Sequence, residues 1–191
     1  MISEALWEQW TAAQRKALRL LTKRKFPDAL AELTQFLCDD YPSELQAEIL
    51  AFRSVIYEKM GHLTDATNDL EKAHSLSKSG TYQLYTIQLS LGRLAERMLD
   101  IPAAASWYLR AIETAKADPS TSGASAIKGL LKTSGLPPWN SEAGKLCERV
   151  LKQAWALFAL PGEADLENIE GTLERLTEAS LLPLPQARGT I

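Results

Sequence analysis

Two stretches of the chain share one pattern of small and large residues: MGHLTDATNDLEKA at residues 60–73 and MLDIPAAASWYLRA at residues 98–111. Unrelated amphipathic helices also match in some register, but their small and large residues rarely fall together at the same places. We therefore interpret the two stretches as copies of one structural unit. The pairs that carry the match are Glu58 with Glu96, Met60 with Met98, Leu63 with Ile101, Ala66 with Ala104, Leu70 with Tyr108 and Ala73 with Ala111.

A weaker copy precedes the first stretch, where Ala29 corresponds to Ala66 and Leu33 to Leu70. Upstream of the second stretch, Gly92 corresponds to Ser54, and both are small. We expect the alanines to be packing positions and the polar residues between them, Asn68 and Asp69, to face solvent.

Apolar residues recur with a helical period along most of the chain, and alternation with a period of two is not sustained anywhere, which predicts an all-α protein. The stripes are Leu6, Trp10, Ala13, Ala17 and Leu20; Phe26, Ala29, Leu33 and Phe36; Leu45, Ile49, Phe52 and Ile56; and Leu84, Ile87, Leu91, Leu94 and Met98. Segments rich in proline, glycine and serine separate these stripes, which is typical of the connections between helices. Such short connections favour antiparallel neighbours.

The pattern resembles the tetratricopeptide repeat, a helix–turn–helix unit of about 34 residues. That repeat has a small residue midway along its first helix and a small–large–small series in its second. This chain departs from it in its spacing of 37 to 38 residues and in its turns, where a glycine stands only at Gly61 while Arg24 and Leu99 take its place elsewhere. Phe36 also replaces the last small residue of the first copy.

The resemblance implies a right-handed α-α superhelix of about three hairpins, at residues 5–40, 43–79 and 81–117, within a repeat array at 1–118. An array of hairpins needs its open end covered. We expect helices within 119–180 to form that cap, or alternatively a degenerate fourth repeat. The tail at 181–191 is expected to be extended or disordered.

The composition of the chain disfavours several classes of function. The 191 residues carry a formal net charge of −3, which does not favour whole-surface binding to nucleic acid or to anionic lipid. The start of the chain, MISEALWEQW, is not typical of a signal peptide, and no apolar run is long enough to span a bilayer. We therefore expect a cytoplasmic protein that does not bind membranes. Cys38 and Cys147 are expected to be buried small hydrophobes.

Residues of the types that form catalytic or metal-binding sites are few in the sequence. His62 and His74 cannot form a triad or a metal cluster with two distant cysteines. The stretch GASAIKGLLKTSG at 123–135 only superficially matches a phosphate-binding loop, because its lysine precedes the glycine and no strand comes before it. We expect no catalytic residues, no cofactor and no metal, and therefore no enzyme.

Register within the repeat predicts which residues line the concave face, where the first helices of such an array lie. The predicted groove consists of Gln14, Glu48, Val55, Glu58, Leu89, Arg93, Glu96 and Arg97. A basic patch on the first helix, Arg15, Arg19 and Lys23, is a second candidate surface. Some members of the family bind chaperone tails through a basic, asparagine-rich clamp. The corresponding positions here are Gln14, Leu18, Phe52, Thr86 and Ser90, so the clamp is not expected.

These observations favour a non-catalytic protein–protein interaction module that binds a partner peptide or helix in its concave groove. An adaptor, a secretion chaperone and an immunity protein all fit that class. The alternatives are a regulator that touches nucleic acid through the basic patch, and an enzyme whose site the sequence does not display. The sequence predicts neither the identity of the partner nor the oligomeric state.

Overall fold

The computed structural model describes residues 3–117, 125, 126, 129, 130, 142–157, 160–165, 171, 172, 174–176 and 178. These residues form α-helices, turns and connections, and none of them lies in a β-strand. The all-α prediction is therefore confirmed for the described part of the chain, whose helices pack in adjacent pairs. The chain divides into two compact units, Met1–Lys78 and Ser79–Ile191, which we describe separately.

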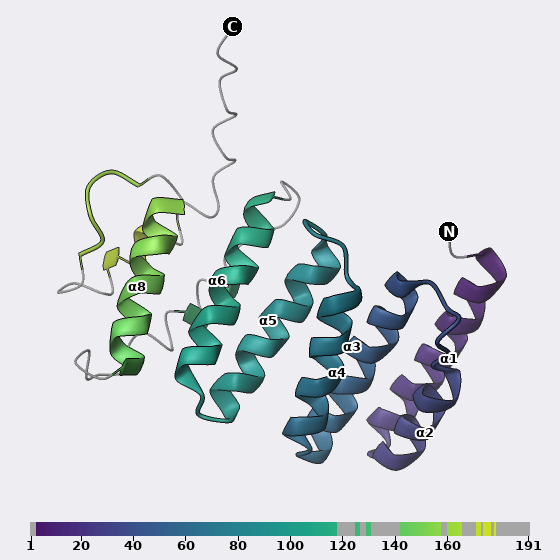
Figure 1. Ribbon diagram of the computed structural model, residues 1–191. Helices are drawn as coiled ribbons and strands as arrows, with labels where there is room; N and C mark the ends of the chain where they lie inside the picture. Colours follow the sequence, from purple (N-terminus) through teal and green to yellow (C-terminus); the bar gives the residue numbers. More distant parts are fainter. Residues whose placement is uncertain are drawn as a thin grey trace, which may run out of the picture. The chain divides into compact units, whose positions relative to one another are not determined.

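The first unit contains four helices, α1 (Glu4–Thr22), α2 (Phe26–Phe36), α3 (Ser43–Met60) and α4 (Leu63–Leu76). Helix α1 packs against α2, α2 against α3, and α3 against α4 (Figure 1). The unit is thus built from two successive helical hairpins. Its core lies between α1, α2 and α3 and consists of Trp10, Ala13, Ala17, Ala29, Leu33, Leu45, Ile49 and Ile56.

The second unit contains a third hairpin, α5 (Tyr82–Arg97) and α6 (Ile101–Ala117), followed by α8 (Glu142–Leu157), which packs against α6. Residues 125, 126, 129 and 130, within a stretch expected to be helical, have helical backbone. Residues 160–163 are not helical. The expected tail at 181–191 and most of the predicted cap between α6 and α8 lie outside the described residues.

The turn inside each hairpin has the same backbone conformation. Arg24, Gly61 and Leu99 adopt positive φ angles of 56°, 80° and 61°, and they stand 37 and 38 residues apart, as the repeat spacing requires. A left-handed residue just after a helix is the usual way to end it. Two of the three positions therefore accept a side chain where glycine would fit without steric cost.

Equivalent backbone hydrogen bonds close each of these turns. The amides of Lys25, His62 and Asp100 donate to the carbonyls of Leu20, Tyr57 and Ala95, each at 2.9 Å. These are the long bonds of the Schellman motif, which satisfy carbonyls that would otherwise be unpaired at the helix end. The three hairpins thus share one local geometry, although their turn residues differ.

Small residues allow the two helices of each hairpin to approach each other closely. Ala29, Ala66 and Ala104 correspond to one another in the repeat, and each has an exposed fraction of 0%. One turn later along each second helix stands a large buried residue: Leu33, Leu70 and Tyr108. An alanine fits between closely packed backbones, and the larger side chain fills the adjoining space. This is the arrangement that the small–large pattern predicts.

Asp69 corrects one expectation, since it is buried rather than facing solvent. Arg53 on α3 donates from Nε and Nη2 to the two carboxylate oxygens of Asp69 on α4, at 2.7 and 2.6 Å. The side chains of Arg53 and Asp69 are only 15% and 9% exposed. The hydrogen bonds to Asp69 raise the pKa of Arg53 above its ordinary value. The pair is a forked contact that ties the second hairpin together.

Two further findings concern surface and membrane expectations. Cys38 is half-buried rather than buried and holds a free thiol, while the side chain of Cys147 lies outside the described set. None of the helices in the described part of the chain is both long enough and apolar enough to cross a membrane.

We expect Leu99→Gly to raise the free energy of unfolding by about 1 kcal/mol, because glycine adopts a positive φ without the clash that a Cβ atom causes. Leu99 is 83% exposed, so little packing is lost with its side chain. Urea unfolding followed by circular dichroism measures the change. The neighbouring Met98 has a φ of −83°, so Met98→Gly is the matched control and should lower the stability by up to about 1 kcal/mol. A less stable Leu99→Gly variant would show that the turn is not strained.

Removing the carboxylate in Asp69→Ala should lower the free energy of unfolding by about 3 kcal/mol, because Arg53 would keep its charge in a largely buried place without a partner. The double variant Arg53→Met/Asp69→Leu should recover most of that loss, since no unpaired charge remains. Glu71→Ala on the exposed side of the same helix is the control and should change stability by less than about 0.5 kcal/mol. Equal losses in Asp69→Ala and Glu71→Ala would contradict the role of the pair.

Candidate functional site

The exposed side of α1 and α3 in the first unit is the candidate functional surface. The Ser3 hydroxyl caps the start of α1 by accepting from the amide of Leu6 at 3.3 Å. Buried Trp10 then fixes the rotation of the helix, because its indole lies in the core and its Nε1 donates to Glu48 of α3 at 3.0 Å. The ring of Trp10 also meets Phe52 edge to face, with 6.1 Å between ring centroids. These contacts hold α1 beside α3.

Three large apolar side chains remain exposed on these two helices. Trp7 and Leu18 on α1 are both 46% exposed, and Val55 on α3 is 39% exposed. Val55 stands 37 residues after Leu18, which is the spacing at which the pattern of small and large residues recurs. Scattered single apolar residues are normal on a protein surface. Here the exposure recurs at an equivalent position of two first helices, which favours a surface with a function.

The predicted groove residues of the first unit differ in their exposure. Gln14, Glu48 and Glu58 are all half-buried. Glu48 accepts the hydrogen bond from Trp10, so its carboxylate is already engaged by the core. Val55 is the one predicted groove residue of this unit that exposes a large apolar side chain.

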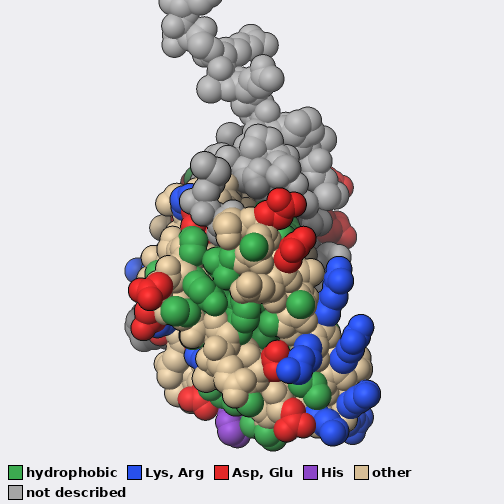
Figure 2. All heavy atoms as spheres, turned by 90° about the vertical axis from the view of Figure 1, so that its right-hand side faces the viewer, with side chains coloured by type: hydrophobic (Ala, Val, Ile, Leu, Met, Phe, Trp, Pro, Cys, Tyr) green, Lys and Arg blue, Asp and Glu red, His purple; other side chains and the backbone are tan. Residues whose placement is uncertain are grey.

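The predicted basic patch lies on α1 and at the residue that directly follows this helix. Arg15, Arg19 and Lys23 are exposed, and within the described residues no ion pair engages any of the three. Their neighbour Lys16 instead pairs with Glu32 of α2. Figure 2 views the side of the molecule that bears α1 and α2, where lysine and arginine side chains (blue) line one margin and hydrophobic side chains (green) gather beside them.

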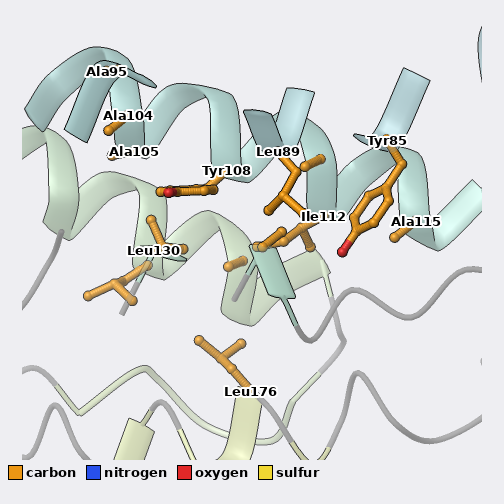
Figure 3. Close-up of a cluster of buried hydrophobic side chains, with 14 of the residues drawn as sticks. Tyr85, Leu89, Ala95, Ala104, Ala105, Tyr108, Ile112, Ala115, Leu130 and Leu176 are labelled. Atoms are coloured by element: carbon orange, nitrogen blue, oxygen red, sulfur yellow. The ribbon is translucent and has the colours of Figure 1, made fainter. Parts of the chain in front are cut away.

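The second unit places its predicted groove residues differently. Leu89 is only 8% exposed and belongs to the hydrophobic core of the unit, so its side chain is not a surface anchor as predicted. Figure 3 shows it pointing towards Ile112 inside that core. Arg93 and Arg97 are exposed, and Glu96 is half-buried. The unit therefore offers charged groups from α5, but not the apolar anchor that the register predicted.

Glu96 is engaged by Tyr108 of α6, whose hydroxyl donates to the carboxylate at 2.8 Å. The ring of Tyr108 lies between Gly92 and Gly129. A Cβ atom added at Gly92 would come within 2.6 Å of this ring, and one added at Gly129 would also collide with it. Burial, and then the contact with Glu96, raise the pKa of Tyr108 well above its ordinary value. Gly129 stands 37 residues after Gly92, so the repeat spacing was the signal that could have predicted its packing role.

Few side chains in the described part of the chain are placed to catalyse a reaction or to bind a metal ion. His62 directly precedes α4, at the end of the turn between α3 and α4, with Nδ1 3.5 Å from the carboxylate of exposed Asp65. No three His, Cys, Asp or Glu side chains among the described residues gather closely enough to hold a metal ion. The buried groups with shifted pKa values have packing partners: Arg53 contacts Asp69, and Tyr108 contacts Glu96. Burial likewise raises the pKa of Tyr85.

Comparison of the chain with protein-family models, with curated proteins and with solved structures finds no match.

Replacing Tyr108 by phenylalanine should lower the free energy of unfolding by about 1 kcal/mol at neutral pH, since the variant loses the bond to Glu96 but keeps the ring. Because the pKa of Tyr108 is raised, this difference in the free energy of unfolding also depends on pH. Above about pH 10 the unfolded chain releases the phenolic proton that the folded chain retains, so the native protein loses stability as the pH rises. Urea unfolding between about pH 8 and pH 11 should therefore show the advantage of the native chain over Tyr108→Phe shrinking.

Tyr82→Phe provides the control at neutral pH, because Tyr82 is 63% exposed and its replacement should change stability by less than about 0.5 kcal/mol. A stability difference between the native chain and Tyr108→Phe that stays constant up to about pH 11 would contradict the effect assigned to the buried phenol.

Proposed function

We propose that the protein is a non-catalytic protein-binding module that holds a peptide or helix of a partner against the first helices of its hairpins. In this proposal the three hairpins stack as a right-handed superhelix of tetratricopeptide-like repeats, and the first helices line its concave side. The repeated turn conformation at Arg24, Gly61 and Leu99 supports the repeat assignment. A cytoplasmic adaptor, secretion chaperone or immunity protein would use such a module.

The observation that carries the proposal is the exposure of Leu18 and Val55 at one repeat position. A residue at this position that served only to stabilise the hairpins would be buried, as Ala17 and Ser54 are at the preceding position. Large apolar residues presented in register on adjacent helices are suited to anchor a partner segment. Trp7 adds an aromatic side chain of the type that dominates many interfaces.

A nucleic-acid-associated regulator is the second candidate, and the exposed side chains of Arg15, Arg19 and Lys23 favour it. Phosphate contacts made by such residues would weaken steeply as salt rises. This alternative gives no role to the exposed aliphatic side chains of Leu18 and Val55. We therefore rank it below protein binding.

Site-specific photocrosslinking tests the proposed function. A photoreactive residue is placed at position 18 or 55 in the full chain and irradiated in the host cell. Position 72 on α4, where Lys72 is exposed, serves as the control site. One protein partner should be captured from positions 18 and 55 and not from 72. With the probe at 55, Leu18→Asp should reduce capture at least about tenfold, because it places a charge where an apolar anchor is needed.

The proposal fails if positions 18, 55 and 72 capture the same proteins, or if neither 18 nor 55 captures any. Leu18 is 46% exposed, so we expect Leu18→Asp to stay folded, and circular dichroism checks that a loss of capture does not reflect unfolding.

A further inference from the structure

We infer that the partner segment is acidic and amphipathic, and that it docks along α1 with apolar side chains on Trp7 and Leu18 and carboxylates on Arg15 and Arg19. The inference rests on the proposed function and specifies the chemistry of its partner. It is carried by three features of α1: the placement of its exposed apolar residues, the placement of its arginines, and the contrast between its charge and that of the chain.

The apolar contacts lie on one side of α1. Trp7 and Leu18 are eleven residues apart, which is close to three helical turns and a separation of about 16 Å along the axis. Each exposes nearly half of its surface. Two anchors at that spacing match an extended or helical segment lying along the helix better than a compact ligand held at a single point.

The arginines form a second strip beside these anchors. Arg15 and Arg19 are four residues apart and therefore lie on one face of α1, and Arg19 directly follows Leu18 in the chain. A segment whose apolar residues contact Leu18 thus has its flank within reach of both guanidinium groups. Arginine is well suited to this role because its planar fork binds a carboxylate through two hydrogen bonds.

The charge of this part of the helix opposes that of the chain. Residues 15–25, which span the second half of α1 and the turn after it, contain six lysines and arginines and no aspartate or glutamate, whereas the whole chain has a net charge of −3. Of the six, Lys16 pairs with Glu32 of α2. The carboxylates of α1, Glu4 and Glu8, stand in its first half. An acidic segment is therefore attracted to the second half of α1 and repelled by much of the remaining surface, which would fix both its position and its direction.

Stabilisation of the helix end does not account for the arrangement. Basic residues near a helix C-terminus interact favourably with its dipole, but this effect fades within the last turn. Helix α1 ends at Thr22, so Arg15 stands about two turns before the end. The dipole also gives no reason for the exposure of Trp7 and Leu18. A binding role explains the apolar and basic residues together.

An acidic protein segment fits this surface better than nucleic acid does. The surface continues onto α3, which contributes the exposed aliphatic side chain of Val55. The exposed aliphatic side chains of Leu18 and Val55 provide no platform on which bases stack, whereas they suit the apolar residues of an amphipathic peptide.

A selection from random peptides of about 16 residues displayed on phage tests the inference without assuming a sequence. The full chain is the bait, and Arg15→Glu/Arg19→Glu is the comparison bait. Lys72→Glu and Lys59→Glu serve as controls, because each reverses an exposed lysine outside α1. The most enriched peptide is then synthesised, and its affinity for each chain is measured by calorimetry, next to that of a single-stranded oligonucleotide of about the same length.

The expected result is enrichment of peptides that carry net negative charge and apolar residues at helical spacing. The synthetic peptide should bind Arg15→Glu/Arg19→Glu at least about tenfold more weakly than the native chain, while the controls stay within about twofold. Its affinity for the native chain should also fall as salt rises. Trp7→Ala should weaken binding as well, since it removes an anchor but no charge.

Other outcomes overturn the inference. Neutral or basic peptides, peptides that bind the charge-reversed chain equally well, or a selection that yields no binder each rule out an acidic partner on α1. If the selected peptides are neutral or basic, or bind the charge-reversed chain equally well, but still lose binding in Leu18→Asp, the proposed function stands and only the acidic partner is wrong. If no selected peptide depends on Leu18 or Val55, both proposals fail. Tighter binding of the oligonucleotide, lost in Arg15→Glu/Arg19→Glu, would assign the surface to nucleic acid instead.

Discussion

The close approach of the two helices within each hairpin is the constraint on which this structure depends. Ala29, Ala66 and Ala104 have no exposed surface, and at each of these places a larger side chain would push the paired helices apart. The turn before each of them then has to bring the chain back within a few residues. The left-handed conformation at Arg24, Gly61 and Leu99 does this in all three hairpins, whatever the side chain.

The first helix of a hairpin both packs into the core and presents residues outwards. Helix α1 illustrates this division over a single turn. Trp10 is 1% exposed and anchors the core, whereas Trp7, three residues earlier, exposes 46% of its surface. The hydrogen bond from Trp10 to Glu48 fixes the rotation of α1 and thereby determines which of its residues face outwards. Two tryptophans one helical turn apart thus have different roles: Trp10 packs in the core, and Trp7 is presented at the surface.

The helices and their packing positions could be predicted from the sequence because both depend on local periodicity. The recurrence of Ala66 and Leu70 as Ala104 and Tyr108 gave the hairpin, and all four residues are buried. Asp69 could not be placed in the same way. Its burial depends on Arg53, which lies on another helix and sixteen residues earlier, and a carboxylate on an amphipathic helix ordinarily faces water.

The candidate surface was predicted less well than the fold, for a related reason. Repeat register assigns each residue a direction, but the surroundings decide whether that direction leads to solvent. Val55 and Leu89 both received outward positions from register, yet Val55 is exposed and Leu89 is part of a core. Leu89 packs in a cluster that includes Ala126 and Leu130, which stand 37 and 41 residues later in the chain. The position of a residue along one helix therefore predicts its exposure less well than its neighbours in the folded protein do.

The confinement of Tyr108 has a consequence for motion within the second unit. Its ring is flanked by Gly92 and Gly129, and its hydroxyl is tied to Glu96. A half-turn of such a ring about its own axis sweeps out more volume than the resting ring occupies, so it requires the two flanking backbones to separate briefly, while the hydroxyl oxygen stays in place because it lies on that axis. The rate of that rotation, visible in the nuclear magnetic resonance lines of the ring protons, thus reports how often the packing around α5 opens, in a protein at rest and without any perturbing substitution.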